Sequence, residues 1–357
     1  MGGPEIHIGD VGTQSVSIVA ASLNKASGLH LGPVKGANTL KVSGNTVEIV
    51  ASAKNVAKGV DAGKGADVTI GSSNAESVSI AGIKTGESQE GADEQAYGIF
   101  NVNQAQTKVY GKTVNVVAKG AKDTRAIHVA NNTEAQDKSA TLTIVGDEVC
   151  ITAESDDPDH STVGISAMSH GQVHITGNTV VTASDAIVAR GSSVVSINAD
   201  GRHYTQINGN VNFSYDAPTS GTSVDATVVL NLVGPESSWT GNMVVTWNGT
   251  PTNKDEYLSV TGMKLGLSKG AVWTPVETGH DSTTVTLVQK YTALNLLENN
   301  DGVINITDSA IDVTVEKMTG TGGTVNLAAD LTAEEGSQTG RITIDEADAN
   351  SKIDVKL

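Results

Sequence analysis

The sequence predicts an all-β protein: a right-handed parallel β-helix with three strands per coil and a C-terminal capping segment. Short runs such as TLTIVG (141–146) and QVHITG (172–177) alternate β-branched and polar residues, which is typical of strands with one buried face. Only 3% of the residues are aromatic, so Val, Ile, Leu and Ala must fill the interior. A thin, repeated core fits that composition.

The predicted strands form three classes that recur in a fixed order. The second class includes LKV (40–42) and LTI (142–144), and the third includes VEI (47–49) and VCI (149–151). The first class opens with Gly or Ala before an apolar residue, and it restarts at Leu29, Val60, Ile99, Ile127, Ile165 and Ile187. The turns between the second and third classes hold glycines suited to positive φ, namely Gly44, Gly111, Gly146 and Gly177.

A fixed strand order with variable loops is typical of a solenoid, in which equivalent strands stack in parallel and the coil is right-handed. An antiparallel β-sandwich is the main alternative, because the turn dipeptides NG, DG and GG also occur. A sandwich, however, does not explain the ordered repeat of three classes.

The composition also excludes several classes of protein. A net charge of −17 argues against nucleic-acid binding, which needs clustered Lys and Arg. No run of 18 apolar residues is present, so the sequence predicts no membrane-spanning helix. The single cysteine, Cys150, excludes an internal disulfide framework, and the alternation of EVCITA gives it an outward or interface position on a strand.

The pattern changes near residue 225, which predicts two regions. Residues 1–224 form β-helix rungs with polar loops, and residues 225–357 form a C-terminal region with longer strands. This second region holds all three tryptophans, Trp239, Trp247 and Trp273. We expect them to form a structural cap that covers the open core at the end of the coil. A platform on which a ligand stacks is the alternative.

An ordered series of short motifs in the second region resembles the C-terminal passenger region of bacterial autotransporters, the type V secreted proteins. The motifs are SSWTG (237–241), LSKGAVW (267–273), TVTL (284–287), GVINI (302–306), MTGTGGTVNL (318–327) and RITI (341–344). The resemblance covers about 120 residues and implies a pectin-lyase-like solenoid whose end is an autochaperone, or pertactin-like, module. The preceding rungs match this family only in style.

The resemblance implies export through the outer membrane to the bacterial cell surface or the extracellular space. The family's precursor has a leader and an outer-membrane barrel, and the start MGGPEIHIGD lacks the features of a leader. We therefore interpret the chain as a passenger fragment. The expected function is that of a non-enzymatic adhesin in host attachment, cell aggregation or biofilm formation and virulence. The expected partner is a host-surface or matrix component, a glycan or another copy of the chain.

Two other functions stay open at this point. A polysaccharide lyase or hydrolase can use the same fold, and an inert stalk could display a functional region that lies further towards the N-terminus. The few arginines, among them Arg125, lie in no recognisable acid–base constellation, and no G-x-S-x-G motif is present. We therefore predict no catalytic residues and no cofactor.

The candidate binding residues lie in two polar loops, 84–97 and 153–162. Insertions on a solenoid often carry recognition. The acidic and histidine residues of these loops are the candidates: Glu87, Glu90, Asp93, Glu94, Asp156, Asp157 and His160. Carboxylates at close spacing also bind hard cations, so Asp156, Asp157 and Asp159 are candidate Ca²⁺ ligands. A solvated acidic loop is the simpler interpretation.

Overall fold

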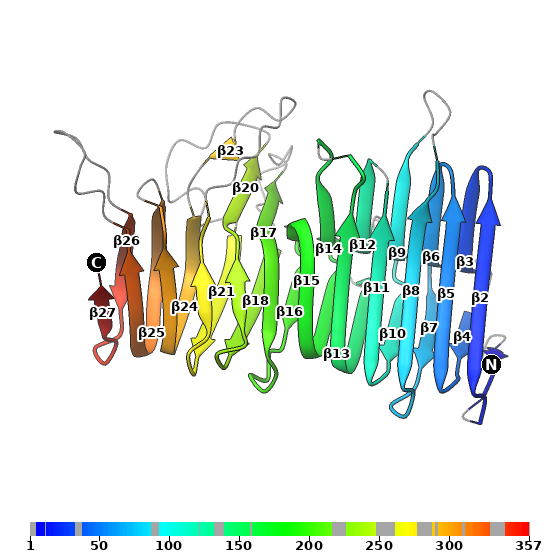
Figure 1. Cartoon of the computed structure of the whole chain (residues 1–357), viewed down its shortest axis with the longest axis horizontal. Helices are drawn as coiled ribbons and strands as arrows, with labels where there is room; N and C mark the ends of the chain where they lie inside the picture. The colour runs from blue at the N-terminus through cyan, green and yellow to red at the C-terminus, as the bar shows by residue number, and fades with distance from the viewer. Residues whose placement is uncertain are drawn as a thin grey trace. The chain divides into compact units, whose positions relative to one another are not determined.

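The protein is all-β and most of its strands run parallel (Figure 1). None of the residues described here is helical. The computed structural model describes residues 5–10, 12–32, 38–86, 93–120, 122–131, 139–157, 159–215, 226–247, 261–276, 288–289, 292–308, 311–328 and 340–356. The chain divides into two compact units, Met1–Val188 and Ala189–Leu357, called unit 1 and unit 2.

The strands of unit 1 form three parallel ladders, in which each strand hydrogen-bonds to its equivalent in the next repeat. The third-class ladder runs β2 (Ser15–Ser22), β5 (Thr46–Ala53), β8 (Ser77–Lys84), β11 (Thr113–Lys119), β13 (Thr141–Glu154) and β15 (Gln172–Arg190). The second-class ladder runs β1 (Glu5–Ile8), β4 (Asn38–Val42), β7 (Ala66–Gly71), β10 (Gln106–Tyr110) and again β13 and β15. The first-class ladder runs β3 (Lys25–Leu31), β6 (Val56–Ala62), β9 (Gln95–Val102), β12 (Asp123–Ala130) and β14 (Thr162–Met168).

The register confirms the three predicted classes in unit 1. In the first class, Leu29 pairs with Val60, which pairs with Ile99, and the row continues through Ile127 to Ile165. Two predicted segments are one residue out of register. Thr107 pairs with Val68 in the second class, and Thr179 pairs with Val149 in the third, so those rows start one residue before Lys108 and Val180.

The positive φ predicted for the four turn glycines is confirmed at one of them and is wrong at the other three. Of the four, only Gly177 has positive φ, at 133°. Gly146 is required by close approach instead, because a Cβ on it would lie 2.9 Å from the carbonyl oxygen of Gly111 in the previous repeat. Stacked turns therefore select a residue without a side chain even where the backbone is in an ordinary region.

Small residues also bend the first-class strands. A Cβ on Gly98 would lie 2.6 Å from the carbonyl oxygen of Ala126 and 2.7 Å from Cγ1 of Val116 on the opposite strand β11. Gly28, Gly59 and Gly164 meet the next repeat and the opposite strand in the same way. We call this row, Gly28, Gly59, Gly98, Ala126 and Gly164, the elbow. It explains why the first class opens with Gly or Ala.

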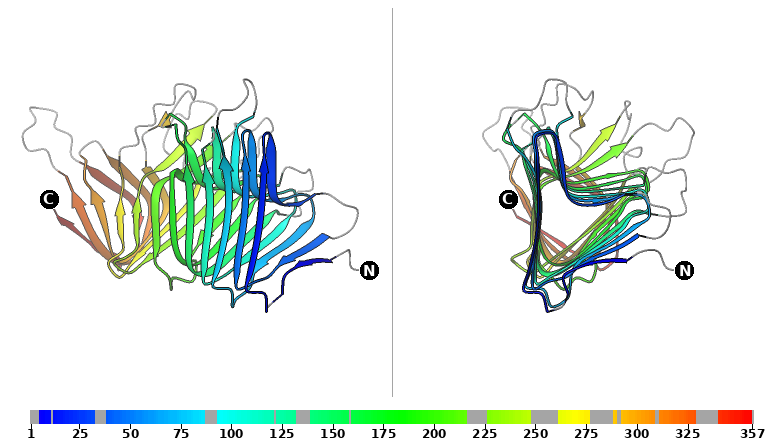
Figure 2. Two further views of the ribbon diagram at one scale, coloured as in Figure 1. Left: turned by 45° about the vertical axis from the view of Figure 1, so that its right-hand side comes forward. Right: turned by 90° about the vertical axis from the view of Figure 1, so that its right-hand side faces the viewer.

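Beyond the elbow the two ladders approach so closely that only small side chains fit between them. The interior there is filled by alanines: Ala26, Ala51, Ala53 and Ala57, with Ala20 packed against them. Figure 2 shows this narrow arm above a wider interior in the blue strands of unit 1. The wider part holds larger residues such as Ile49, Ile80 and Ile144, which are fully buried.

Unit 2 repeats the parallel pairing, but the longer strands predicted for it are limited to β24 (Thr292–Ile306) and β25 (Asp312–Leu327), and several of its strands are short. One ladder runs β16 (Val194–Ile197), β18 (Ala226–Val233), β21 (Thr261–Ser268), β24, β25 and β26 (Arg341–Ala347). A second runs β17 (Thr205–Tyr215), β19 (Ser238–Thr240), β22 (Val272–Thr274), β24, β25 and β27 (Ile353–Lys356). β20 (Met243–Trp247) pairs parallel with β17 and antiparallel with β23 (Val288–Gln289).

Two of the tryptophans form part of the interior of unit 2. Trp239 and Trp273 pair in register and stack with ring centroids 5.0 Å apart, and both are fully buried. Each indole N–H donates to a backbone carbonyl, of Gly209 at 3.0 Å and of Gly241 at 3.1 Å. The same inward row continues past Trp273 to Ile304 and Val325, so these rings lie within the stack.

Several other predictions for the second region concern residues that the structure does not describe. The backbone of Trp247 pairs with that of Tyr215, but its side chain is not described. The motif TVTL at 284–287 and the predicted boundary between residues 224 and 225 lie outside the described residues. No helix long and apolar enough to cross a membrane occurs in the described part of the chain.

We predict that Trp273→Ala lowers the free energy of unfolding by about 3–5 kcal/mol, because it removes a fully buried ring and leaves a cavity beside Trp239. Leu23→Ala is the control, since the Leu23 side chain is 81% exposed. Urea denaturation of the purified chain measures both. Equal effects of the two changes would contradict the packing role of Trp273.

Candidate functional site

The two predicted binding loops leave unit 1 at equivalent positions. One joins β8 to β9 and the other joins β13 to β14, with the short turn after β11 between them. Glu87 and Glu90 lie outside the described residues, and Asp93 is exposed. Glu94 is paired: Lys84 Nζ lies 3.5 Å from one of its carboxylate oxygens and Lys122 Nζ lies 4.0 Å from the other. Lysines therefore offset part of the acidic charge at this corner.

The acidic loop between β13 and β14 forms a self-contained turn. Asp157 Oδ1 accepts a hydrogen bond from the backbone N–H of Asp159 at 3.0 Å, and Asp157 Oδ2 lies 3.1 Å from His160 Nδ1. Asp156 is exposed. Among the described residues, no three His, Cys, Asp or Glu side chains gather closely enough to hold a metal ion. The observed contacts hold the loop in shape.

The densest cluster of polar and aromatic side chains lies on the outer side of the elbow. The strand bends there, so outward residues three positions apart converge on the concave side. Lys58 Nζ lies 3.5 Å from Asp61 Oδ1, and the rings of Tyr97 and Phe100 are 5.1 Å apart. In the next repeat, Arg125 Nη1 lies 3.2 Å from His128 Nδ1. We call these pairs, together with Asp123 and Ser166, the elbow ladder.

Stacking along the ladder joins successive repeats. Phe100 pairs in register with Asp61 on one side and His128 on the other. Its ring stacks on His128 at 5.2 Å with an interplanar angle of 19°. Lys58 Nζ lies 3.5 Å from the centroid of Phe100 in a cation–π contact. Phe100 thus lies between a cation and an aromatic ring.

Hydrogen bonds complete the ladder. Asp123 accepts from the Tyr97 hydroxyl and, at 2.6 Å, from Arg125 Nε. Arg125 Nη1 also donates to Ser166 Oγ at 3.3 Å, and Ser166 Oγ lies 3.2 Å from His128 Nδ1. Each charged group therefore has a partner of opposite sign or a neutral acceptor within the ladder.

Burial shifts the pKa values of three side chains in the ladder. It lowers the pKa of His128 to about 3, and the nearby Arg125 cation acts in the same direction. Burial also lowers the pKa of Lys58, although Asp61 opposes this. The pKa of the Tyr97 hydroxyl is raised, first by burial and then by Asp123. At neutral pH the ladder therefore holds a neutral imidazole and a protonated phenol.

The reactive side chains of the ladder are buried and contact one another. Ser166 is fully buried, and Tyr97 and His128 are 3% and 8% exposed. A nucleophile or base must reach a substrate, and these atoms are already engaged with each other. The arrangement suits stable docking of successive repeats. The sequence indicates the ladder in the segments KGVD, YGIF, RAIH and VGIS. In each segment, the first and last residues, on either side of the small–apolar pair, are the ones that converge.

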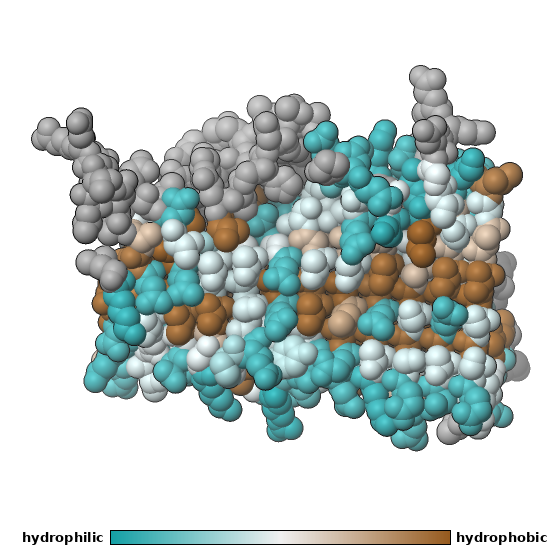
Figure 3. Space-filling model, viewed as in Figure 1, coloured by the Kyte–Doolittle hydropathy of each residue, from teal (hydrophilic) through white to brown (hydrophobic). Residues whose placement is uncertain are grey.

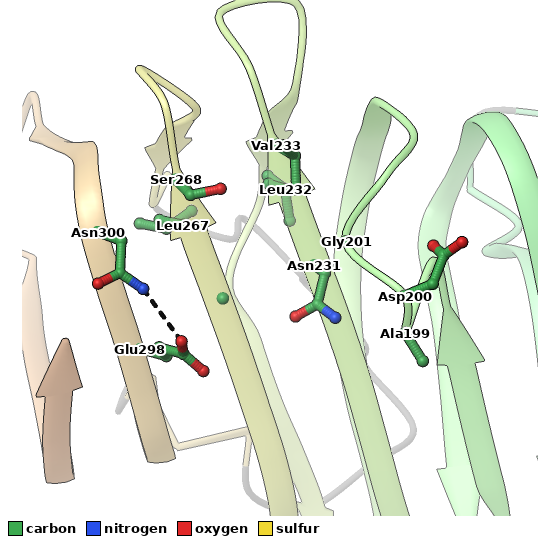
Figure 4. Close-up of a pocket in the computed structure, with 11 residues that line it drawn as sticks. Ala199, Asp200, Gly201, Asn231, Leu232, Val233, Leu267, Ser268, Glu298 and Asn300 are labelled. Atoms are coloured by element: carbon green, nitrogen blue, oxygen red, sulfur yellow. Dashed lines mark hydrogen bonds between the residues drawn. The ribbon is translucent and has the colours of Figure 1, made fainter.

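Unit 2 contains a separate polar pocket of about 260 Å³. It lies over the ends of β18 and β21, the middle of β24 and the turn after β16, as Figure 4 shows. Its polar lining consists of Asp200, Asn231, Ser268, Glu298 and Asn300. No local sequence pattern marks these residues, because they come from four separate segments that only the strand register brings together.

No model of a protein family, no curated protein and no solved structure matches the chain.

We predict that His128 makes stability depend on pH between about 6.5 and 3. The unfolded chain takes up a proton on this imidazole below its ordinary pKa near 6.5, whereas the folded chain does so only near pH 3. Stability should thus be full above pH 6.5 and fall as the pH decreases. His128→Gln removes this proton, so between pH 7 and 4.5 it should lose about 2–3 kcal/mol less than the unaltered chain. Urea denaturation across this range measures the difference. Parallel pH profiles for both chains would contradict the assignment.

Proposed function

We propose that the chain is a right-handed parallel β-helix and the passenger of a secreted bacterial surface protein, acting as a non-enzymatic adhesin. The β-helix is supported by the three ladders of unit 1, in which strands of each class pair with their equivalents about 30 residues along. The link to autotransporter passengers is supported by the ordered motifs of the second region. Several of these motifs, among them GVINI and RITI, form paired strands in unit 2.

The observation that carries the adhesive role is an outward apolar row on the third-class ladder. Val19 pairs in register with Val50, and the row continues through Ala81 to Val117. Val19 is 67% exposed, Val50 and Val117 are half-buried, and Ala81 between them is buried. Figure 3 shows apolar residues running across β5, β8 and β11 on this face. Exposed contiguous apolar surface marks interaction sites in soluble proteins.

The neighbouring outward row is polar, with Ser17, Glu48, Ser79 and Asn115 in register. Rows of each kind thus repeat at the strand spacing of about 4.8 Å along one flat face. A second copy presents the same rows, so two faces can match over several repeats. Many weak contacts of this kind give avidity without a deep pocket. Aggregation of cells through contacts between copies is the form of adhesion that this face supports best.

The alternatives are a polysaccharide-degrading enzyme and an inert stalk. In the elbow ladder, Asp61 and Asp123 are each paired with a cation, and Ser166 is buried. These contacts favour a structural use of the ladder over acid–base catalysis. Cleavage of acidic polysaccharides by the purified chain with Ca²⁺ would favour the enzyme. If the chain is an inert stalk, it should show no adhesion.

The test is aggregation of microbeads coated with the purified chain. We predict that the double substitution Val50→Lys and Val117→Lys slows aggregation about tenfold, because like charges face each other across the contact and avidity multiplies the loss. The control is Thr69→Lys with Thr143→Lys, which adds the same charge at outward positions of the second-class ladder. Equal slowing by both pairs, or bead aggregation that never occurs, would contradict the proposal.

A further inference from the structure

The pocket of unit 2 exists because one glycine interrupts a row of side chains. Asn231, Gly266 and Glu298 pair in register on β18, β21 and β24. A Cβ on Gly266 would lie 2.5 Å from Asn231 Oδ1, so the amide of Asn231 leans into the gap. Figure 4 shows Asn231 and Glu298 on the strands that flank β21. Side chains from β18 and β24 therefore line the gap, and the backbone of β21 forms its base.

Each of the two amides in this pocket uses one of its two N–H donors, and several oxygen acceptors are open. Asn231 Nδ2 donates to the carbonyl of Asn198 at 3.2 Å, and Asn300 Nδ2 donates to Glu298 Oε1 at 3.0 Å. Within the described part of the chain, Asn231 Oδ1, Glu298 Oε2 and Ser268 Oγ have no hydrogen-bond partner. The open groups thus include three oxygen acceptors, beside one N–H of each amide and the hydroxyl hydrogen of Ser268.

The charge of the pocket is also of one sign. Asp200 and Glu298 line it, and no Lys or Arg is among the described residues that line it. The imidazole Nε2 of His203 lies 3.9 Å from Asp200 Oδ2. β18 and β21 lie between the turn that holds Asp200 and strand β24, which holds Glu298. The backbones of Asp200 and Glu298 are therefore about 14 Å, or three strand spacings, apart. These carboxylates are therefore too far apart to chelate a single metal ion.

We infer that this pocket binds a protonated primary amine, the group at the end of a lysine side chain on a partner protein. An ammonium group supplies donors and a positive charge, which suit the open oxygens of Glu298 and Asn231 on the two strands that flank Gly266. Glu298 is exposed, so the contact is weak, with a dissociation constant in the millimolar range, on the order of 1–100 mM. Such a site adds selectivity for basic partners to an acidic surface.

The test uses n-butylamine at pH 7 as the probe and n-butanol as its neutral counterpart. Nuclear magnetic resonance of the labelled full chain follows the backbone amides of Gly266 and Ser268. We predict saturable shifts with the amine and none with the alcohol. Glu298→Gln should weaken amine binding about threefold to tenfold, since it removes a partly screened charge. Glu346→Gln, the same change on exposed β26, should leave it unaltered.

Three results would overturn the inference: equal shifts with butanol and butylamine, unchanged binding in Glu298→Gln, or equal weakening in Glu346→Gln. A fourth is saturation of the same amides by Ca²⁺ well below the amine concentration, which would make this a metal site. Gly266→Ala, which places a methyl group in the gap, should abolish the amine shifts. The assay uses the isolated chain, so this inference and the proposed adhesive role can fail independently.

Discussion

The close approach of two ladders at the elbow is the constraint on which unit 1 depends. A Cβ on each elbow glycine would lie within 2.8 Å of a carbonyl oxygen of the next repeat and of a methyl group of the opposite strand. Overpacking such a position forces backbone shifts, because protein interiors are close-packed. Gly or Ala at this one position per repeat allows a strand to bend while its hydrogen-bonded register continues.

Other features of unit 1 follow from that bend. On the inner side, the ladders beyond the elbow enclose an interior only wide enough for alanine. On the outer side, residues three apart converge, so successive repeats bring together an ion pair, an aromatic pair and an arginine–histidine pair. Stacking then joins these pairs from repeat to repeat, with Phe100 between Lys58 and His128. The elbow thus links the thin interior to the cohesion of the outer surface.

Sequence reasoning succeeded where the information was local. The rows from Leu29 to Ile165 were identified from alternation and the preceding small residue, and their pairing follows those rows. It failed where a contact depends on the next repeat. Gly146 was assigned to a positive-φ turn, yet a carbonyl of another repeat requires it. Arg125 fits no known short motif: Asp123 and His128 are close in sequence, but the cluster is completed by Ser166, which lies 41 residues away. The pocket of unit 2 needs the register of four segments, which no short pattern encodes.

The most direct test of this account is the free energy of unfolding of substitutions at Gly98. A Cβ on Gly98 would lie 2.6 Å from the backbone carbonyl oxygen of Ala126, so Gly98→Ala should cost about 1–2 kcal/mol, even though a less flexible unfolded chain offsets part of the strain. Gly98→Val adds two methyl groups against Ala126 and Val116 and should cost about 2–3 kcal/mol or more. A Gly98→Val chain as stable as Gly98→Ala would contradict the claim that close approach at the elbow governs the fold of unit 1.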